Sequence, residues 1–418
     1  MRYENKILII ASFILFCCHS DEKLILAKVD REEILLSDFQ NKYESFLSQK
    51  YQNDNLSNRY AYLNNLIDEK LILKYAYDQK LDKDTSYTKK AKIIFNQLLL
   101  NEYFDKKINL DFSTNEDELK NVFMWEKKAL NIRHLFSRDK QGIDKIYSNL
   151  KNGKSWELLA KECFNDTLLK QNGGDLGWYN IGELDPVFEW NAYQLKLGEI
   201  SKPVRTKDGY SIIQIVDVEL NGLLLEDEYQ SKRKKVKNRL KNYKQQLSLL
   251  NFTDSTILEL DIKFDSTELE NIYNFLLPLS NLELENIKYN TLVYFDNENW
   301  NVSKALNQLS SLSSKQLSRI NDVFDLKQVI IGLICRNIHI DNAIKDDFHK
   351  TKSFKYNLRQ NLDQTMIKKV VADINKRVKN KNDQYHEKII ENYFNFRKEL
   401  MLASIIEIDS TLIKNFIM

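Results

Sequence analysis

Cysteine, proline and glycine are scarce in this sequence, which has 4 Cys, 3 Pro and 10 Gly in 418 residues. Two of the cysteines are adjacent near the N-terminus, and the other two, Cys163 and Cys335, lie far apart. No Cys-x-x-Cys or Cys/His spacing occurs, so neither a disulfide framework nor a zinc site is indicated. The five His are scattered and form no His-Glu-x-x-His motif. We therefore expect no metal site and no cofactor.

The chain also lacks an excess of charge of either sign. It has 62 Lys and Arg against 60 Asp and Glu, which gives a net charge of +2. No block of one sign is long enough to indicate nucleic-acid binding. With 43% hydrophobic and 29% charged residues, the composition is that of an ordinary globular protein. A chain of this length is expected to hold two to four domains.

The N-terminus has the pattern of an export signal. Arg2 and Lys6 flank the start of an apolar run at residues 7–16, which is too short to span a bilayer. We therefore interpret residues 1–20 as a signal peptide that directs the protein to the periplasm. Cys18 follows the run, so attachment of a lipid to Cys18 and a plain cleaved signal both remain open.

The rest of the chain divides into four regions. Residues 21–125 begin with a short strand, a turn and a second apolar segment, and continue with helices of regular apolar spacing. Residues 126–220 alternate strands and helices with short connections, which is typical of an α+β domain. Residues 221–288 start with a Lys- and Arg-rich helix, interpreted as a solvated connecting helix and linker. Residues 289–418 are again mainly helical.

This last region partly repeats the first. Residues 292–303 align without gaps on residues 26–37, and a predicted long helix at 351–378 parallels one at 86–107. In each region, apolar residues recur at matching positions in the stretch between the aligned segment and the long helix. We therefore predict that 289–418 is a divergent repeat of the N-terminal domain.

Three of the ten glycines fall within the six residues Gly173–Trp178. Glycine permits positive φ and close approach of the backbone. In a chain so poor in glycine, the cluster indicates a tight, shaped loop. The residue types alone also fit a plain structural turn.

The sequence around this loop carries a family resemblance. Five segments that follow one another through the domain resemble a parvulin-type peptidyl-prolyl isomerase: IRHLF (132–136), GKSWELLAKECFND (153–166), GGDLGW (173–178), GELDPVFEWNAYQLKLGEISKPVRTKDGY (182–210) and SIIQI (211–215). The helical region before them resembles the chaperone part of exported parvulins such as SurA, PrsA and PpiD. The resemblance implies an α+β fold, in which an antiparallel sheet with surrounding helices is flanked by mainly helical SurA-like modules.

Isomerisation of an X–Pro bond is rotation over a barrier of ~18–20 kcal/mol. No bond is broken, so the site has to hold the prolyl ring in an apolar slot and favour the twisted amide. Polar groups beside the slot orient the carbonyl or weaken the amide resonance.

The resemblance assigns this chemistry to named residues. By position, the proline slot falls on Leu176, Leu184 and Phe188. The polar positions fall on His134, on Asp166 or Thr167, on Thr206 and on Ser211.

The sequence departs from the family at two positions. Ser211 stands where the family has a second His, and Phe164 stands where it usually has Ser. The first change predicts reduced activity, since a pair of hydrogen-bonded histidines cannot form.

The function expected from the sequence is therefore that of an exported prolyl isomerase and chaperone. Its partners would be unfolded or proline-containing polypeptides of the cell envelope, with membrane attachment only through an N-terminal lipid and with no nucleic acid. The alternatives are a non-catalytic holdase and an assembly factor that serves one partner. Nothing in the sequence indicates an oligomeric state.

Overall fold

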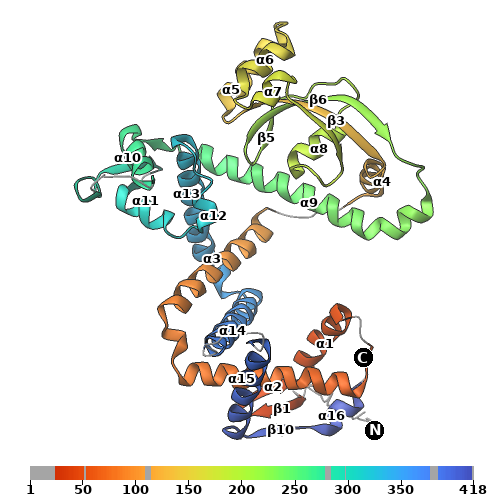
Figure 1. The fold of residues 1–418 in the computed structure, drawn as a ribbon, viewed down its shortest axis with the longest axis vertical. Coiled ribbons are helices and arrows are strands. Elements are labelled where there is room, and N and C mark those ends of the chain that lie inside the picture. Colours follow the sequence, from red (N-terminus) through yellow and green to blue (C-terminus); the bar gives the residue numbers. More distant parts are fainter. Residues whose placement is uncertain are drawn as a thin grey trace, which may run out of the picture. The chain divides into compact units, whose positions relative to one another are not determined.

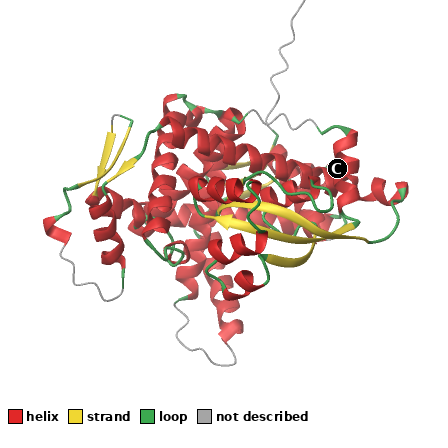
Figure 2. Ribbon diagram, turned by 90° about the horizontal axis from the view of Figure 1, so that it is seen from above, coloured by secondary structure: helices red, strands yellow, loops and turns green. Residues whose placement is uncertain are grey.

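The computed structural model describes residues 24–50, 53–108, 114–277, 284–296, 298–376 and 385–416 (Figure 1). The predicted signal peptide, residues 1–20, and its Cys18 lie outside these residues. The chain forms two compact units, one made of Met1–Leu98 with Thr351–Met418 and the other of Leu99–Lys350. Helices predominate, and the strands gather in three sheets (Figure 2). The predicted α+β class is confirmed.

The first unit combines both ends of the chain. Its elements are β1 (Ile25–Val29), β2 (Glu32–Leu35), α1 (Leu36–Lys50), α2 (Leu56–Asp78), a 3-10 turn (Leu81–Lys83), the first half of α3 (Thr85–Lys107), α14 (Lys352–Asn375), α15 (Tyr385–Leu402), β10 (Ile406–Ile408) and α16 (Ser410–Asn415). Helix α2 begins where the Asn55 side chain accepts a hydrogen bond from the Asn58 N–H, and its apolar residues recur at helical spacing on the buried side.

The sheet of this unit joins segments that lie far apart in the sequence. Its order is β10-β1-β2, and Ala27 in β1 pairs with Ile408 in β10. Ile413 from α16 is fully buried in the same core as residues of β1, α1 and α2. On α15, the Arg397 guanidinium binds both carboxylate oxygens of Asp68 in α2, at 2.8 and 2.7 Å. The C-terminal segment therefore completes the N-terminal domain.

The second unit ends with a similar sheet and its helices. These elements are β7 (Lys263–Phe264), α10 (Ser266–Leu276), a 3-10 turn (Leu284–Asn286), β8 (Thr291–Phe295), β9 (Glu298–Asn301), α11 (Val302–Leu309), α12 (Ser314–Leu317), α13 (Val323–Lys345) and a second 3-10 turn (Phe348–Lys350). The strand order is β7-β8-β9.

The two hairpins have the same register. Ala27 pairs with Ile34 in the first, and Val293 pairs with Trp300 in the second, at the positions that the sequence alignment made equivalent. All four side chains are buried. Both hairpins carry an irregularity one residue before this pair. These matches support a duplicated hairpin, and we keep the duplication as a proposal.

The division of the chain corrects the ranges expected from the sequence. Residues 351–418 belong with the N-terminal unit and not with 289–350, because β10 pairs with β1 and α14 packs on α2. Residues 99–125 belong to the second unit and not to the N-terminal domain. A strand carries no local sign of which distant strand will pair with it, so the sequence could not assign these partners.

The central domain lies in the second unit. It consists of α4 (Glu116–Trp125), β3 (Lys128–Ser137), α5 (Lys140–Lys151), α6 (Trp156–Cys163), α7 (Thr167–Gln171), β4 (Asp175–Asn180), α8 (Pro186–Gln194), β5 (Val204–Thr206), β6 (Gly209–Leu220) and the start of the long helix α9 (Glu226–Glu259). Its four strands are all antiparallel, in the order β4-β3-β6-β5.

Helices cover both faces of this sheet, because apolar side chains alternate along its strands. Leu135 and Ile212 pack with α5 and α6 on one face. Ile132, Ile213 and Ile215 pack with α4, α8 and α9 on the other face. Phe188 belongs to this second core, and Leu176 and Leu184 pack against it.

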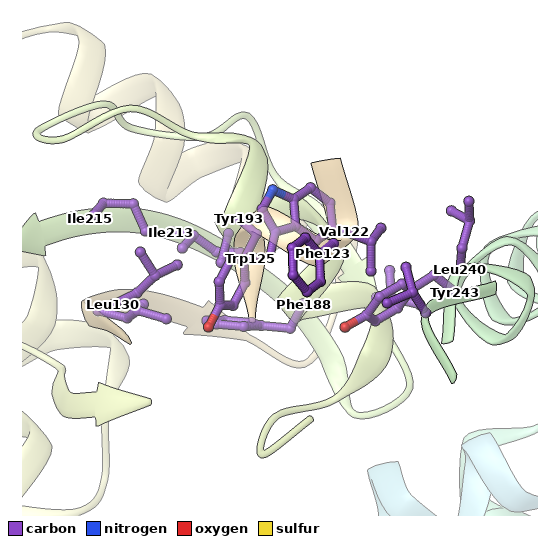
Figure 3. Packing of buried hydrophobic residues seen from close by; sticks show 14 of the residues in the cluster. Val122, Phe123, Trp125, Leu130, Phe188, Tyr193, Ile213, Ile215, Leu240 and Tyr243 are labelled. Carbon is purple, nitrogen blue, oxygen red and sulfur yellow. The ribbon is translucent and has the colours of Figure 1, made fainter. Parts of the chain in front are cut away.

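Helix α9 is not the solvated connector that its composition suggested. Four of its side chains at helical spacing are buried in the core of the central domain: Tyr229, Val236, Leu240 and Tyr243. Figure 3 shows Leu240 and Tyr243 in the same cluster as Phe123, Phe188 and Trp125. The many Lys and Arg residues lie between these apolar positions, so the helix is amphipathic and forms part of the domain.

Candidate prolyl-isomerase site

His134 lies on β3, in the middle of the sheet, and its side chain contacts that of Ser211 on the neighbouring β6. The His134 Nδ1 lies 3.3 Å from the Ser211 Oγ. Ser211 is only 3% exposed and His134 is half-buried, so the buried hydroxyl finds its partner in the imidazole. The two side chains are therefore within hydrogen-bonding distance, although the family's pair of histidines is absent.

The His134 imidazole is surrounded by aromatic rings. Its centroid lies 5.2 Å from that of Phe164, 5.8 Å from that of Phe188 and 6.3 Å from that of Phe136. Burial lowers the His134 pKa from 6.5 to about 4, because an apolar environment disfavours the charged form. The ring is thus neutral at pH 7, with one donor and one acceptor nitrogen.

This low pKa predicts a loss of stability in acid. Between pH 6.5 and pH 4 the unfolded state binds a proton at His134 that the folded state does not, so stability falls as the pH falls. The loss is expected to reach about 3 kcal/mol at pH 4, at ~1.4 kcal/mol per pH unit. Urea unfolding of wild type and His134→Gln at several pH values measures it, since the difference between the two isolates His134. Parallel pH profiles would contradict the prediction.

The three residues assigned to the apolar slot pack against one core. Phe188, on α8, is 6% exposed, and Leu176 and Leu184 are half-buried against the same cluster (Figure 3 shows Phe188 within it). The Phe188 ring meets the His134 ring edge to face, with an interplanar angle of 80°. The structure therefore places the His134–Ser211 pair next to at least one wall of the expected slot.

Helix α8 is positioned by its first residues. The Asp185 carboxylate accepts hydrogen bonds from the N–H groups of Val187 and Phe188, and Pro186 occupies the first turn. These are the preferred residues for a helix start. They fix the turn from which the Phe188 side chain projects.

The glycine loop lies against the backbone of His134. The Gly174 carbonyl accepts the His134 N–H at 3.0 Å, and the Gly173 carbonyl accepts the Trp156 Nε1–H at 2.8 Å. Gly174 has a φ of 74°, and a Cβ there would lie 2.1 Å from the His134 carbonyl oxygen. Both the conformation and the contact therefore require glycine.

The other predicted polar residues have structural contacts. The Thr206 hydroxyl, buried at the end of β5, donates to the Gly209 carbonyl at 3.2 Å and closes the β5–β6 turn. Asp166 is exposed and caps α7 by accepting the Leu169 N–H at 2.9 Å. Thr167 is the exposed first residue of α7. Within the described part of the chain, none of the three forms a hydrogen bond with His134, so their catalytic roles stay predictions.

One buried carboxylate was missed by the sequence reasoning. Glu189 on α8 is 1% exposed and accepts the Gly182 N–H at 2.6 Å. It also accepts the hydroxyl of Tyr243 from α9. The hydrogen bond from Gly182 holds the loop that carries Leu184. Glu189, and Tyr243 which binds it, are therefore positioning residues. A lone Glu within the apolar segment 187–193 was the available signal.

The arrangement suits chemistry without a covalent step. It offers an apolar wall, a neutral imidazole and a buried hydroxyl. In the described residues, no group of three or more His, Cys, Asp and Glu is placed to hold a metal ion. An imidazole and a hydroxyl beside an apolar slot can direct hydrogen bonds at an amide whose geometry changes in the transition state.

The comparison with known families agrees with this geometry. A family model described as the PPIC-type PPIase domain, or rotamase, matches residues 137–217. The central domain therefore carries a parvulin-type (PPIC) domain, which we call the parvulin domain.

Two curated relatives extend the similarity beyond the parvulin domain. The foldase protein PrsA of Geobacillus kaustophilus is 32% identical over 173 residues, which cover 38% of this chain and 62% of that protein. The foldase protein PrsA of Geobacillus sp. strain WCH70 is 28% identical over 236 residues, which cover 54% of this chain and 85% of that protein. The chain thus spans less than two thirds of the length of the first of these relatives.

Solved structures are similar over parts of the chain. The peptidylprolyl isomerase PrsA of Bacillus anthracis shares 28% identity, with 45% of this chain and 96% of that chain covered and a TM-score of 0.24. A SurA-like chaperone of Campylobacter jejuni shares 23% identity, with 58% of this chain and 100% of that chain covered and a TM-score of 0.28.

Within the residues described, no helix is both long and apolar enough to cross a membrane.

Proposed function

We propose that this protein is an exported peptidyl-prolyl cis-trans isomerase and chaperone that assists the folding of envelope or secreted proteins. The observation that carries the proposal is the His134–Ser211 pair beside Phe188 in a PPIC-type domain. The relatives named as PrsA foldases support a role on polypeptide clients.

In this proposal the prolyl ring enters the slot of Leu176, Leu184 and Phe188. The neutral imidazole of His134 uses one nitrogen for Ser211 and keeps the other for a second hydrogen bond. A site of this kind accelerates isomerisation by binding the twisted amide better than the planar one. Asp166, Thr167 and Thr206 are further candidates for polar contacts to the substrate.

The location follows from the same proposal. The leader at residues 1–20 would direct export to the periplasm, and Cys18 would receive the lipid if the protein is anchored. Mass spectrometry of the mature N-terminus distinguishes a lipid-bearing Cys18 from a plain cleaved end.

The isomerase claim has a direct test. Wild-type protein is expected to accelerate cis-trans isomerisation of a proline-containing tetrapeptide, and His134→Ala with Phe188→Ala is expected to lose at least 10-fold of that acceleration (about 1.4 kcal/mol). A stopped-flow or protease-coupled assay measures both. Wild-type activity equal to that of the double variant would overturn the catalytic claim.

A non-catalytic holdase is the second candidate, because Ser211 replaces the second family His. A holdase would suppress aggregation of an unfolded outer-membrane protein equally well before and after the double substitution. An assembly factor for one client would instead co-purify with a single dominant partner.

A further inference from the structure

The second unit contains a pocket that lies outside the prolyl-isomerase site. Its volume is about 480 Å³, and it is lined by residues of α3, α9, α13 and the β8–β9 hairpin. That volume is within the ~300–1,000 Å³ common for ligand pockets. The prolyl-isomerase chemistry assigned above uses none of its lining residues.

The inner wall of the pocket is aromatic. Tyr103 from α3 and Phe295 from β8 are buried, and Phe252 from α9 is half-buried. The rings of Tyr103 and Phe252 lie 5.8 and 5.0 Å from the ring of His339, measured between centroids. An apolar or aromatic group of a ligand would therefore be enclosed by rings.

Among the described residues, the buried side chain of His339 has no hydrogen-bond partner. It lines the pocket from α13, is 4% exposed, and neither ring nitrogen has a partner within the structure. Burial lowers its pKa, so the ring is neutral at pH 7 and has one donor and one acceptor. An unsatisfied buried group of this type costs ~1–3 kcal/mol. A ligand that supplied the missing partner would recover part of that free energy.

The rim of the pocket is acidic. Four exposed carboxylates, those of Glu259, Asp296, Glu298 and Asp341, line it together with one cation, Lys345. Such a rim repels phosphates and carboxylates and attracts Lys or Arg. The rim therefore favours a cationic partner over an anionic cofactor.

We propose that this pocket binds a polypeptide segment in which an aromatic or large aliphatic side chain is next to Lys or Arg. The apolar side chain occupies the aromatic wall, a backbone amide of the segment pairs with His339, and the cationic residue meets the rim. A peptide amide matches the imidazole because each has one donor and one acceptor. The proposal rests on the proposed function in that the segment belongs to a client polypeptide.

The experiment uses a fluorescent peptide without proline, so that binding does not depend on the prolyl slot. The peptide carries Phe flanked by Lys, and two companions replace Phe by Gly or Lys by Glu. Anisotropy titration of the full chain is expected to give binding of the first peptide and at least 10-fold weaker binding of each companion. Equal affinity for all three peptides, or no binding of the first, would overturn the proposal.

Variants locate the binding. Ser255→Trp places a bulky ring at the pocket mouth and is expected to weaken binding at least 10-fold. Ser231→Trp is the matched control, because Ser231 is also exposed on α9 and its hydroxyl also bonds a backbone carbonyl, but it does not line the pocket. His339→Phe keeps an aromatic ring and removes the hydrogen bond, for an expected loss of about 5-fold.

The two failures are distinguishable. If Ser255→Trp binds the peptide as tightly as Ser231→Trp does, the pocket proposal is wrong, whatever the isomerase assay gives. If the wild type binds this peptide but does not accelerate isomerisation of the proline tetrapeptide, the catalytic claim fails and the pocket stands.

Discussion

Gly174→Ala is expected to lower the free energy of unfolding of the parvulin domain by about 3 kcal/mol. Gly174 has a φ of 74°, and a left-handed conformation costs ~1–2 kcal/mol for a residue with a Cβ. The new methyl group would also lie 2.1 Å from the His134 carbonyl oxygen and 2.8 Å from a ring carbon of Phe164. Relief of such contacts in a packed core costs a further ~1–3 kcal/mol.

The matched control for this prediction is Gly153→Ala. Gly153 also has positive φ, 88°, but apart from its chain neighbours no described residue has a heavy atom within 4 Å of the position of its Cβ. That substitution is expected to cost only the backbone strain, about 1 kcal/mol. Urea unfolding, followed by fluorescence of the tryptophans, compares the two. If both variants lost the same free energy of unfolding, the close approach of Gly174 to the His134 carbonyl would add nothing to the cost of the substitution.

The movement forced by the Gly174 methyl group has a second consequence. The His134 carbonyl oxygen lies on the same residue as the imidazole, so relief of the contact would displace β3 at the site. Gly174→Ala is therefore expected to reduce isomerisation at temperatures where the domain is still folded, whereas Gly153→Ala leaves it unchanged.

Glu189→Ala is expected to have an effect of similar size, for a different reason. The substitution removes a buried acceptor and leaves the Gly182 N–H and the Tyr243 hydroxyl without a partner. The Tyr243 hydroxyl is buried, and an unsatisfied buried group costs ~1–3 kcal/mol, whereas water can replace the bond to the exposed Gly182, so we expect a loss of about 2 kcal/mol. Thermal or urea unfolding measures it. Substrate binding is expected to weaken as well, because the loop that carries Leu184 loses its anchor.

Two variants separate the anchor from a general effect of charge. Glu189→Gln retains an acceptor for the loop and is expected to keep most of the stability. Glu183→Ala removes an exposed carboxylate that also accepts a backbone N–H, from Asn180 at 2.7 Å. That exposed site is expected to cost less than 1 kcal/mol, since water replaces the lost bond. A loss as large as that of Glu189→Ala would argue against a role for burial.

The sequence predicted the parvulin domain well because its motifs are local and ordered along the chain. Three of its elements are each specified by their own residues. They are the GGDLGW loop, the helix start at Asp185-Pro186 and the strand around His134. Asp166 was a prediction of a different kind, because it was taken from the family by position alone. Its carboxylate was assigned to the site by position, and in the structure it caps α7, so a catalytic role for it stays a prediction.

The features that were missed depend on partners that are distant in the sequence. The composition of helix α9 is that of a charged connector. Its buried face packs on α4 and α8, and that face consists of Tyr229, Val236, Leu240 and Tyr243. Glu189 is another example, because the hydroxyl that satisfies it comes from Tyr243. Local propensity cannot identify such partners.

The pairing of β1 with β10 sets the order in which the protein can fold. During synthesis the parvulin domain emerges complete, whereas the N-terminal domain waits for residues 351–418. Until then β1 has an open edge, and the Ile413 site in its core is unfilled. Open edges of this kind pair with other chains, and contacts of high sequence separation form slowly. In a protein proposed to protect unfolded clients, the N-terminal domain is thus itself incomplete until residues 351–418 are made.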